Sequence, residues 1–287
     1  MVRDKINYKF KTHRVELFNN INICYTDEGK GDKTIVFIHG LANYSEIWHE
    51  QIEELKKDYR CVAIDLPGCG LSSRGDFNFS MLFYSEVIQK FCEKLKLSNV
   101  ILCGHSMGGH IAIVTTLRFP ALAGKLVLIA PSGFEKFNSF EISLLKNSIS
   151  IGNMFFNDET HLVTLLKQSF YKMSESGSKM ISDLVVMLKS ENMRQWRNMV
   201  EQCVLGMLNE QVFDLLQFIE CPVLAVFGEN DTLIPNIYFH PVTTKRIAEK
   251  ACAEIPNAQL IVIPFSGHAV FMEKPKEVNR LIAGFIS

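Results

Sequence analysis

Short apolar segments bounded by turn residues alternate with amphipathic segments through the first half of the chain. Most of the apolar segments are almost continuously apolar, which is typical of strands covered on both faces in a parallel sheet. The amphipathic segments 45–57 and 81–97 repeat apolar residues at helical spacing. This alternation predicts βαβ units and a doubly wound, mostly parallel α/β sheet. The predicted strands are Ile21–Tyr25, Thr34–His39, Tyr59–Asp65, Val100–Gly104 and Lys125–Ala130.

The alternation stops near Gly133, and the sequence from there to about residue 210 has helical patterns only. Strand patterns resume at Pro222–Gly228 and Gln259–Pro264, and a final amphipathic helix follows them. We therefore predict one sheet domain with a helical cap inserted after the sixth strand of its core. The predicted bounds are 1–132 and 211–287 for the core, and 133–210 for the cap.

The charge balance excludes several classes of partner. The chain has 30 Lys and Arg against 31 Asp and Glu, and a formal net charge of −1. Electrostatic binding of a nucleic acid needs a basic surplus or a basic stripe, so we expect no nucleic-acid partner. No window reaches the ~20 consecutive apolar residues of a membrane span, so we expect no stable membrane insertion. Composition leaves the oligomeric state open.

The cysteines and the first residues bear on the compartment. The eight cysteines are scattered, without a C-x-x-C pair or a Cys/His cluster at zinc spacing. Residues 1–11 are rich in charge and lack the apolar region of a signal peptide. We expect free thiols, a cytoplasmic location, no metal and no cofactor.

A G-x-S-x-G pattern centred on Ser106 is the strongest local signal. It follows the predicted strand 100–104 and precedes a predicted helix over 110–119. This context is that of a nucleophile elbow, a turn so tight that its flanking residues must be small, as Gly104 and Gly108 are. Ser106 is therefore the candidate nucleophile.

A serine nucleophile needs a base and an acid that orients the base. His268 follows the last predicted strand and is the candidate base, while Asp231 follows the preceding strand and is the favoured acid. The chain order Ser, Asp, His is the one that accompanies this elbow. Glu229 and Glu135 remain rival acids, since each also follows a strand. Of the other charged and titratable residues near these strand ends, we expect Glu273 to stabilise the start of the last helix, and His240 to be a surface or packing residue.

The segment His39-Gly40-Leu41 supplies the third element of the predicted site. The backbone N–H groups of Leu41 and Met107 could together stabilise a developing oxyanion. We expect His39 to brace this loop rather than to transfer protons, with Gly40 making the turn. The segment 68–73 begins like a dinucleotide-binding G-x-G-x-x-G motif, but Ser73 replaces the last glycine and no helix pattern follows, so we reject that interpretation.

Taken together, these residues resemble the α/β-hydrolase superfamily, in its capped, serine-esterase-like branch. The resemblance implies that Ser106, Asp231 and His268 form a catalytic triad, and that the helical insertion is a cap. It spans nearly the whole chain and rests on five blocks in the family's order. The blocks are His39-Gly40, residues 65–72, residues 104–109, residues 228–231 with Ile234-Pro235, and Gly267-His268 with Glu273 and Pro275.

Departures from the family's subgroups narrow the expected reaction. Ser106 stands where haloalkane dehalogenases and epoxide hydrolases carry Asp and dienelactone hydrolases carry Cys. Carbon–carbon bond hydrolases of ring-cleavage products usually carry Asn before the nucleophile and Trp after the histidine, and here His105 and Ala269 stand there. We expect hydrolysis of a carboxylic ester, or with less support a thioester. A carbon–carbon bond hydrolase, an acyltransferase and a non-catalytic ligand receptor stay open as alternatives.

The predicted cap is rich in methionine and phenylalanine, which could close over a small-to-medium apolar substrate. The same side chains could instead only pack the cap helices together and onto the sheet. The residues are Met154, Met173, Met180, Met187, Met193, Met199 and Met207, and Phe134, Phe137, Phe140, Phe155, Phe156 and Phe170.

Overall fold

The computed structural model describes residues 7–152, 159–190 and 193–287. Within these ranges one sheet of eight strands has the order β1-β2-β4-β3-β5-β6-β7-β8. The strands from β3 to β8 are parallel to one another, while β2, near one edge, runs antiparallel to both of its neighbours, β1 and β4. The strands are β1 Thr12–Glu16, β2 Asn22–Glu28, β3 Thr34–Ile38, β4 Arg60–Ile64, β5 Val100–His105, β6 Ala123–Ile129, β7 Val223–Gly228 and β8 Ala258–Ile263.

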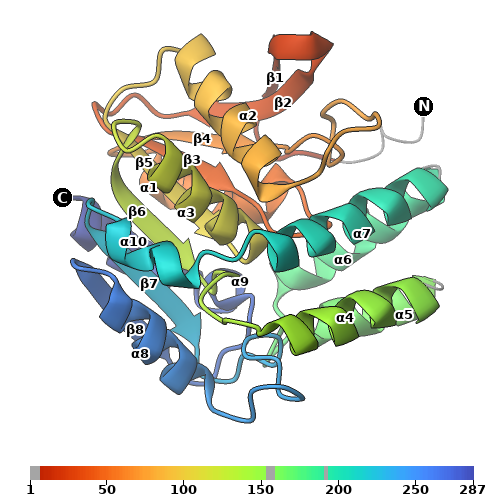
Figure 1. Cartoon of the computed structure of the whole chain (residues 1–287). Helices are drawn as coiled ribbons and strands as arrows, with labels where there is room; N and C mark the ends of the chain where they lie inside the picture. Colours follow the sequence, from red (N-terminus) through yellow and green to blue (C-terminus); the bar gives the residue numbers. More distant parts are fainter. Residues whose placement is uncertain (1–6, 153–158, 191–192) are drawn as a thin grey trace.

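Helices cover both faces of the sheet, as the apolar strands predict (Figure 1). Helices α2, α3 and α8 pack with one face, and α1, α9 and α10 pack with the other. The helices and short 3₁₀ turns outside the insertion are η2 Phe18–Asn20, η3 Ser45–Trp48, α1 His49–Leu55, α2 Met81–Lys94, α3 Met107–Arg118, η4 Phe213–Phe218, α8 Thr244–Glu254, α9 Val270–Glu273 and α10 Pro275–Ile286.

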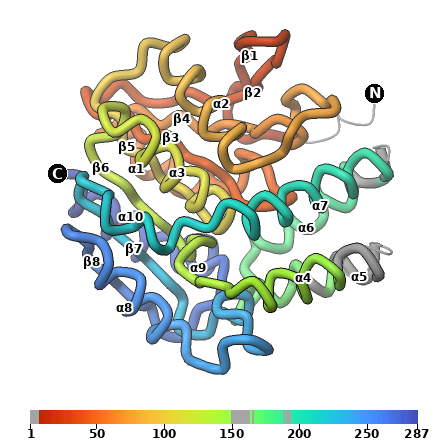
Figure 2. Tube along the Cα trace, in the orientation of Figure 1, coloured from red at the N-terminus to blue at the C-terminus, as the bar shows by residue number. Residues whose placement is uncertain are grey.

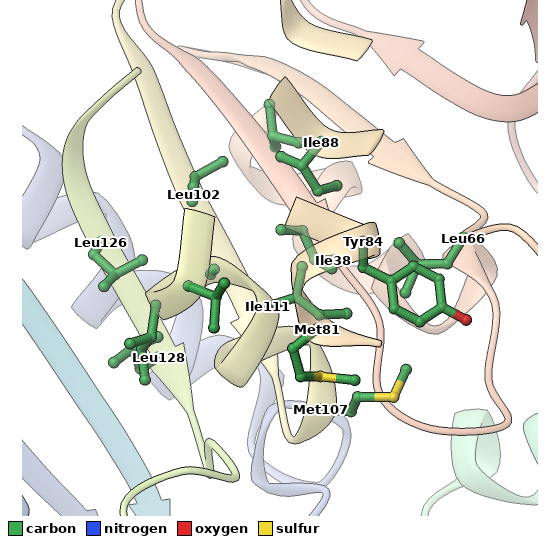
Figure 3. Packing of buried hydrophobic residues seen from close by; sticks show 14 of the residues in the cluster. Ile38, Leu66, Met81, Tyr84, Ile88, Leu102, Met107, Ile111, Leu126 and Leu128 are labelled. Atoms are coloured by element: carbon green, nitrogen blue, oxygen red, sulfur yellow. The ribbon is translucent and has the colours of Figure 1, made fainter. Parts of the chain in front are cut away.

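Alternate residues of the central strands belong to different cores because strand side chains point to opposite faces. In β5, Leu102 packs with α2 and α3, whereas Ile101 belongs to the cluster on the α1 and α10 side. Figure 3 shows the first cluster, where Leu126 and Leu128 of β6 approach Ile111 of α3. The predicted doubly wound, mostly parallel sheet is confirmed.

Strand β1 and helix α8 are among the elements that were not predicted. Strand β1 is an edge strand with alternating half-buried and exposed residues, so it lacks the apolar run that marks the inner strands. Helix α8 buries only Thr244, Ala248 and Ala251, which are too small to form a recognisable apolar stripe among charged neighbours. Helix α3 also begins at Met107 rather than at His110, so it starts immediately after the predicted nucleophile.

Among the described residues, four α-helices lie between β6 and β7, within the predicted insertion. They form two arms that project from the same side of the sheet (Figures 1 and 2). We name α4 and α5 the first arm, and α6 and α7 the second arm. The predicted division at 133–210 into core and cap stays a prediction. The helices are α4 Ser139–Gly152, α5 Glu159–Gln168, α6 Glu175–Ser190 and α7 Met193–Asn209.

Most of the cap's described sulfur and aromatic side chains pack rather than face solvent. Met180 and Met187 of α6 join the core on the α1 side, and Met199 of α7 joins the opposite core. Phe134 and Phe170 are buried as well, whereas Phe140 is 71% exposed. Met154, Phe155, Phe156 and the side chain of Met193 lie outside the described residues.

Candidate active site

Ser106 occupies a strained turn between β5 and α3. Its φ of 54° and ψ of −119° lie in a region that residues with a side chain rarely adopt. Main-chain hydrogen bonds hold the turn in place. The Ser106 N–H donates to the carbonyl of Ile129, the last residue of β6. The Ser106 carbonyl in turn accepts from the N–H groups of Gly109, His110 and Ser132. The predicted elbow geometry is therefore present.

The two elbow glycines have no room for a side chain. A Cβ on Gly104 would lie 2.3 Å from the Gly108 carbonyl oxygen, and one on Gly108 would lie 2.2 Å from the Ile38 carbonyl oxygen. These contacts lock β5, the elbow and the end of β3 together. They confirm the requirement for small residues that the motif predicts.

The loop after β3 passes directly over the elbow. A Cβ on Gly40 would lie 3.2 Å from the Ser106 Cβ, so the following residue, Leu41, is held close to the serine. Within the described residues, the N–H groups of Leu41 and Met107 donate no hydrogen bond. Met107 is also the first residue of α3, where the helix dipole favours negative charge. Both predicted donors are therefore available to an anion beside Ser106.

His39 is fully buried and holds this loop in place. Its Nδ1–H donates to the Gly40 carbonyl at 2.8 Å, and its Nε2 accepts from the Leu66 N–H at 3.1 Å. This pattern requires the neutral ring, and burial lowers the pKa of His39 from its ordinary value. The bracing role predicted for His39 agrees with these contacts.

His268 and Asp231 are brought together although they come from different loops. The Nδ1–H of His268 donates to Asp231 Oδ2 at 2.8 Å, and both side chains are buried. The other carboxylate oxygen accepts from the N–H groups of Leu233 and Ile234, which fixes its orientation. Since Nδ1 carries the proton, Nε2 of the neutral ring can accept another.

The serine and the histidine are not hydrogen-bonded in this structure. Among the described residues, the Ser106 hydroxyl donates to no acceptor on His268. Such bonds are often long or misaligned without substrate and tighten when substrate binds.

The two rival acids lie elsewhere. Glu229 is exposed. Glu135 is buried but accepts from the Asn236 N–H at 2.8 Å and pairs with His240 Nδ1 at 2.6 Å. Burial raises the pKa of Glu135, and the contacts with His240 and Asn236 oppose this shift. Asp231 is thus the carboxylate that meets His268. His240, which was expected to be a surface or packing residue, is half-buried and hydrogen-bonded to Glu135.

The rejected glycine-rich segment forms a compact turn after β4 without a following helix. Gly68 and Gly70 both have positive φ, and a Cβ on Gly70 would lie 2.1 Å from a carboxylate oxygen of Asp65. Asp65 accepts from the N–H groups of Ser45 and Leu71, so the turn serves to organise backbone around a buried carboxylate.

The described part of the chain has neither a metal-binding cluster nor a membrane-spanning helix. No group of three His, Cys, Asp or Glu side chains there is placed to hold a metal ion. None of the helices in those ranges is both long and apolar enough to cross a membrane. None of the eight cysteines, all of which lie in the described ranges, forms a disulfide, and six of them are buried.

Comparison with known proteins identifies the family to which this chain belongs. The family model for the alpha/beta hydrolase fold matches residues 33–275, which spans all the strands from β3 to β8. The chain belongs to the α/β-hydrolase fold family. The superfamily and fold inferred from the five sequence blocks are confirmed.

Two relatives of this α/β-hydrolase-fold chain that are named as hydrolases are distant in sequence. It is 24% identical over 277 residues to an uncharacterized hydrolase of Bacillus subtilis, covering 93% of this chain and 95% of the relative. It is 27% identical over 293 residues to a 2-hydroxy-6-oxononadienedioate/2-hydroxy-6-oxononatrienedioate hydrolase of Burkholderia vietnamiensis, covering 95% and 93%.

Solved structures agree on the fold. A probable hydrolytic enzyme from Pseudomonas aeruginosa has a TM-score of 0.83 at 19% identity, covering 98% of this chain and 95% of that one. An esterase from Exiguobacterium antarcticum has a TM-score of 0.79 at 19% identity, covering 96% and 99%. At these identities, the likeness establishes the architecture alone.

His105 is a site residue of this hydrolase-fold chain that sequence reasoning did not single out. Its Nε2–H donates to the His268 carbonyl at 3.1 Å, and its ring lies 4.8 Å from the rings of His268 and Phe271, centroid to centroid. Burial lowers the pKa of His105 well below its ordinary value, so the ring is neutral. Its position next to the nucleophile was the only available signal.

Glu273 differs from its predicted role. The N-cap of α10 has no side-chain hydrogen bond, and the Glu273 carboxylate accepts from the N–H groups of Gly267, Tyr171 and Lys172 instead. The reason is that α9 ends at Glu273 and turns its side chain back towards the His268 loop. The residue therefore belongs to the surroundings of the candidate base.

A small cavity of about 70 Å³ lies between α3, the end of β6 and α7. His110, Ser132 and Met207 are among its lining residues. Ser132 also donates its N–H to the Ser106 carbonyl, so this cavity is next to the elbow. Of the cap methionines, Met207 is thus one that borders open space near the site.

Proposed function

We propose that this chain is a serine hydrolase that cleaves a carboxylic ester of a small-to-medium apolar substrate, and a thioester with less support. The observation that carries the proposal is the buried His268–Asp231 hydrogen bond of 2.8 Å beside the strained elbow of Ser106. A buried acid that fixes the tautomer of a histidine next to such a serine is the arrangement that activates a hydroxyl.

In the proposed reaction, the Ser106 hydroxyl attacks the ester carbonyl while Nε2 of His268 takes its proton. The carbonyl oxygen becomes an oxyanion, which the N–H groups of Leu41 and Met107 stabilise. His268 then gives its proton to the departing alcohol, leaving an acyl group on Ser106. A water molecule attacks this acyl-enzyme, transfers its proton to His268 and releases the acid. The proton returns to Ser106, and Asp231 remains ionised throughout.

Exposed apolar side chains near the candidate acid support an apolar substrate. The loop after Asp231 exposes Leu233, Ile237 and Tyr238, and the neighbouring helix α4 exposes Phe140 and Leu144. The loop and the helix are adjacent, since Nε2 of His240 in the loop lies 3.8 Å from Oε1 of Glu141 in α4. Large apolar side chains that are left exposed on neighbouring elements can mark a place where an apolar ligand or partner binds.

The test uses p-nitrophenyl esters of increasing acyl length and a fluorophosphonate probe. We expect turnover of the short and medium esters, covalent labelling at Ser106, and loss of both in Ser106→Ala. Product analysis with added alcohol or thiol separates hydrolysis from acyl transfer. Absence of both turnover and labelling in the unmodified protein would overturn the proposal.

A carbon–carbon bond hydrolase is the second candidate, and the relatives named as 2-hydroxy-6-oxononadienedioate/2-hydroxy-6-oxononatrienedioate hydrolases support it. Against it, His105 and Ala269 stand where such enzymes usually carry Asn and Trp. The absorbance of a 2-hydroxy-6-oxo dienoate substrate falls when its carbon–carbon bond is cleaved. Cleavage of this compound faster than of any p-nitrophenyl ester would favour the second candidate.

A further inference from the structure

A short segment between the two cap arms touches the loop that carries His268. We call this segment, residues 168–172, the strap. Glu273 joins it to the loop, because Oε1 accepts from the Gly267 N–H at 2.7 Å and from the Tyr171 N–H at 3.2 Å. Its other oxygen accepts from the Lys172 N–H at 2.8 Å. One carboxylate therefore holds the residue before His268 and two residues of the strap.

Two further hydrogen bonds connect the strap to the residues that directly follow the candidate base and the candidate acid in the chain. The N–H of Ala269, directly after His268, donates to the Ser169 carbonyl at 2.9 Å. On the acid's side, the Thr232 hydroxyl donates to the Gln168 carbonyl at 2.8 Å. The strap thus contacts the neighbours of both members of the His268–Asp231 pair.

The strap and the His268 loop are packed without a gap. A Cβ on Gly267 would lie 2.7 Å from the Tyr171 nitrogen and 2.8 Å from the Ser169 oxygen. Because the strap and Gly267 are in direct contact, a displacement of the strap also displaces Gly267. Since the Ser106 hydroxyl and His268 are not hydrogen-bonded in this structure, the position of this loop decides whether proton transfer can occur.

We propose that Glu273 is a positioning residue that couples the strap, and through it the first cap arm, to the imidazole of His268. This inference rests on the proposed serine-hydrolase function. Glu273 does not touch the reacting atoms; it sets the place of the base by holding Gly267 and the strap in one hydrogen-bonded unit. Removal of its carboxylate leaves the nucleophile and oxyanion donors in place but releases the base.

The experiment compares the rate and the end point of fluorophosphonate labelling at Ser106. In Glu273→Ala we expect the second-order labelling rate to fall about 10- to 100-fold, because a small misplacement of a reacting group costs up to about 10²-fold. Labelling should still reach completion, since the serine itself is intact. Glu277→Ala is the matched control: it removes an exposed carboxylate four positions away and should label within about twofold of the unmodified protein. A merely destabilised protein would instead show a lower end point at an unchanged rate.

Glu273→Gln distinguishes the carboxylate's two contacts. Its amide oxygen can still accept from Gly267, but its NH₂ group cannot accept from Lys172, so we expect an intermediate labelling rate. Steady-state kinetics should show the loss in kcat, with KM within about twofold, because the base rather than the binding surface is displaced.

Hydrogen–deuterium exchange gives a readout that does not depend on activity. In Glu273→Ala, we expect the amides of residues 267–269 and 169–172 to lose protection together, and those of α3 to keep theirs. Unchanged protection of these two segments, or labelling within twofold of the unmodified protein, would overturn the inference. If the unmodified protein is not labelled at all, the proposed function fails, while the exchange experiment still reports on the coupling.

Discussion

The nucleophile side and the cap side of the candidate site are built from different kinds of contact. Around Ser106, backbone groups at the ends of β3, β5 and β6 meet one another, and Gly104 and Gly108 leave no space for a side chain. At the cap, single side chains reach across long stretches of sequence. Glu273 binds the backbone of Tyr171 and Lys172, and Tyr44 donates to Asp183 of α6 at 2.6 Å.

The difference indicates which half of the site is rigid. A turn made of interlocked backbone has one arrangement, because any displacement breaks several main-chain contacts at once. A segment held mainly by side-chain hydrogen bonds, as the strap is, can shift when a few of these bonds break, and each contributes about 1 kcal/mol. We therefore expect substitutions on the nucleophile side to abolish activity or folding, and substitutions on the cap side to have graded effects.

The largest expected effect is on catalysis at the buried acid. Asp231→Asn removes the charge that holds the Nδ1–H tautomer of His268, and the same change in a known Ser-His-Asp triad lowers kcat about 10⁴-fold. Glu229→Gln is the matched control, since this exposed carboxylate is two residues away, and kcat should stay within about twofold. Steady-state ester hydrolysis measures both. If the two variants had equal activity, Asp231 would not be the orienting acid.

The next effect is on stability at the elbow. Gly108→Ala forces a Cβ to within 2.2 Å of the Ile38 carbonyl oxygen, and overpacking of this kind destabilises a fold by about 3 kcal/mol. Gly124→Ala in β6 meets nothing within 4 Å and should change the free energy of unfolding by about 0.5 kcal/mol or less. Urea unfolding measures both, and a stable Gly108→Ala variant would show that the elbow can relax.

A pH effect is expected at His110, which joins the elbow helix to the end of the second arm. Its Nε2–H donates to the Glu210 carbonyl at 2.8 Å, and burial lowers its pKa from 6.5 to about 4. The unfolded chain therefore binds a proton that the folded protein excludes, so stability is lost as pH falls from about 6.5 towards 4. The loss from this group is at most about 3 kcal/mol.

His110→Gln keeps an N–H donor but does not titrate. We expect its free energy of unfolding to depend less steeply on pH than that of the unmodified protein between pH 6.5 and 4, as measured by urea unfolding. Parallel pH profiles for the two proteins would show that the buried neutral His110 does not contribute to acid sensitivity.

The smallest effect is expected where the second arm meets the core. Tyr44→Phe removes the hydrogen bond to Asp183, which keeps its ion pair with Lys179, so the cost should be about 1 kcal/mol. Tyr59→Phe is a matched control, because its hydroxyl makes only a 3.4 Å contact with the Ala283 carbonyl. Thermal unfolding compares the two. A cost at Tyr44 as large as that of Gly108→Ala would remove the contrast between the two sides.

The predictability of the site follows the same division. The elbow, Leu41 and the pair Asp231 and His268 could be named in advance because each follows a predicted strand, and the carboxyl ends of parallel strands meet at one edge of a sheet. The sequence left Glu135 and Glu229 as rivals of Asp231. Only the folded structure distinguished Asp231 from these two rivals, because Glu135 is hydrogen-bonded to His240 and Glu229 is exposed.

Local sequence was also misleading where small or charged residues carry a structural role. Helix α8 was not predicted because its buried face consists of threonine and alanine. Glu273 was expected to stabilise α10, because its distance in the chain from the strap gave no sign that they are neighbours. Its carboxylate satisfies N–H groups about 100 positions away, and a single sequence does not record such a contact.

The sequence by itself therefore determined the sheet, the elbow and the order of the candidate triad, since these depend on local periodicity and on glycines that permit one turn. The tertiary structure alone decided which acid meets His268, where the cap's methionines pack, and how the strap holds the base. These outcomes depend on long-range contacts between side chains and backbone, whose partners are chosen by the packing of whole elements rather than by neighbouring residues.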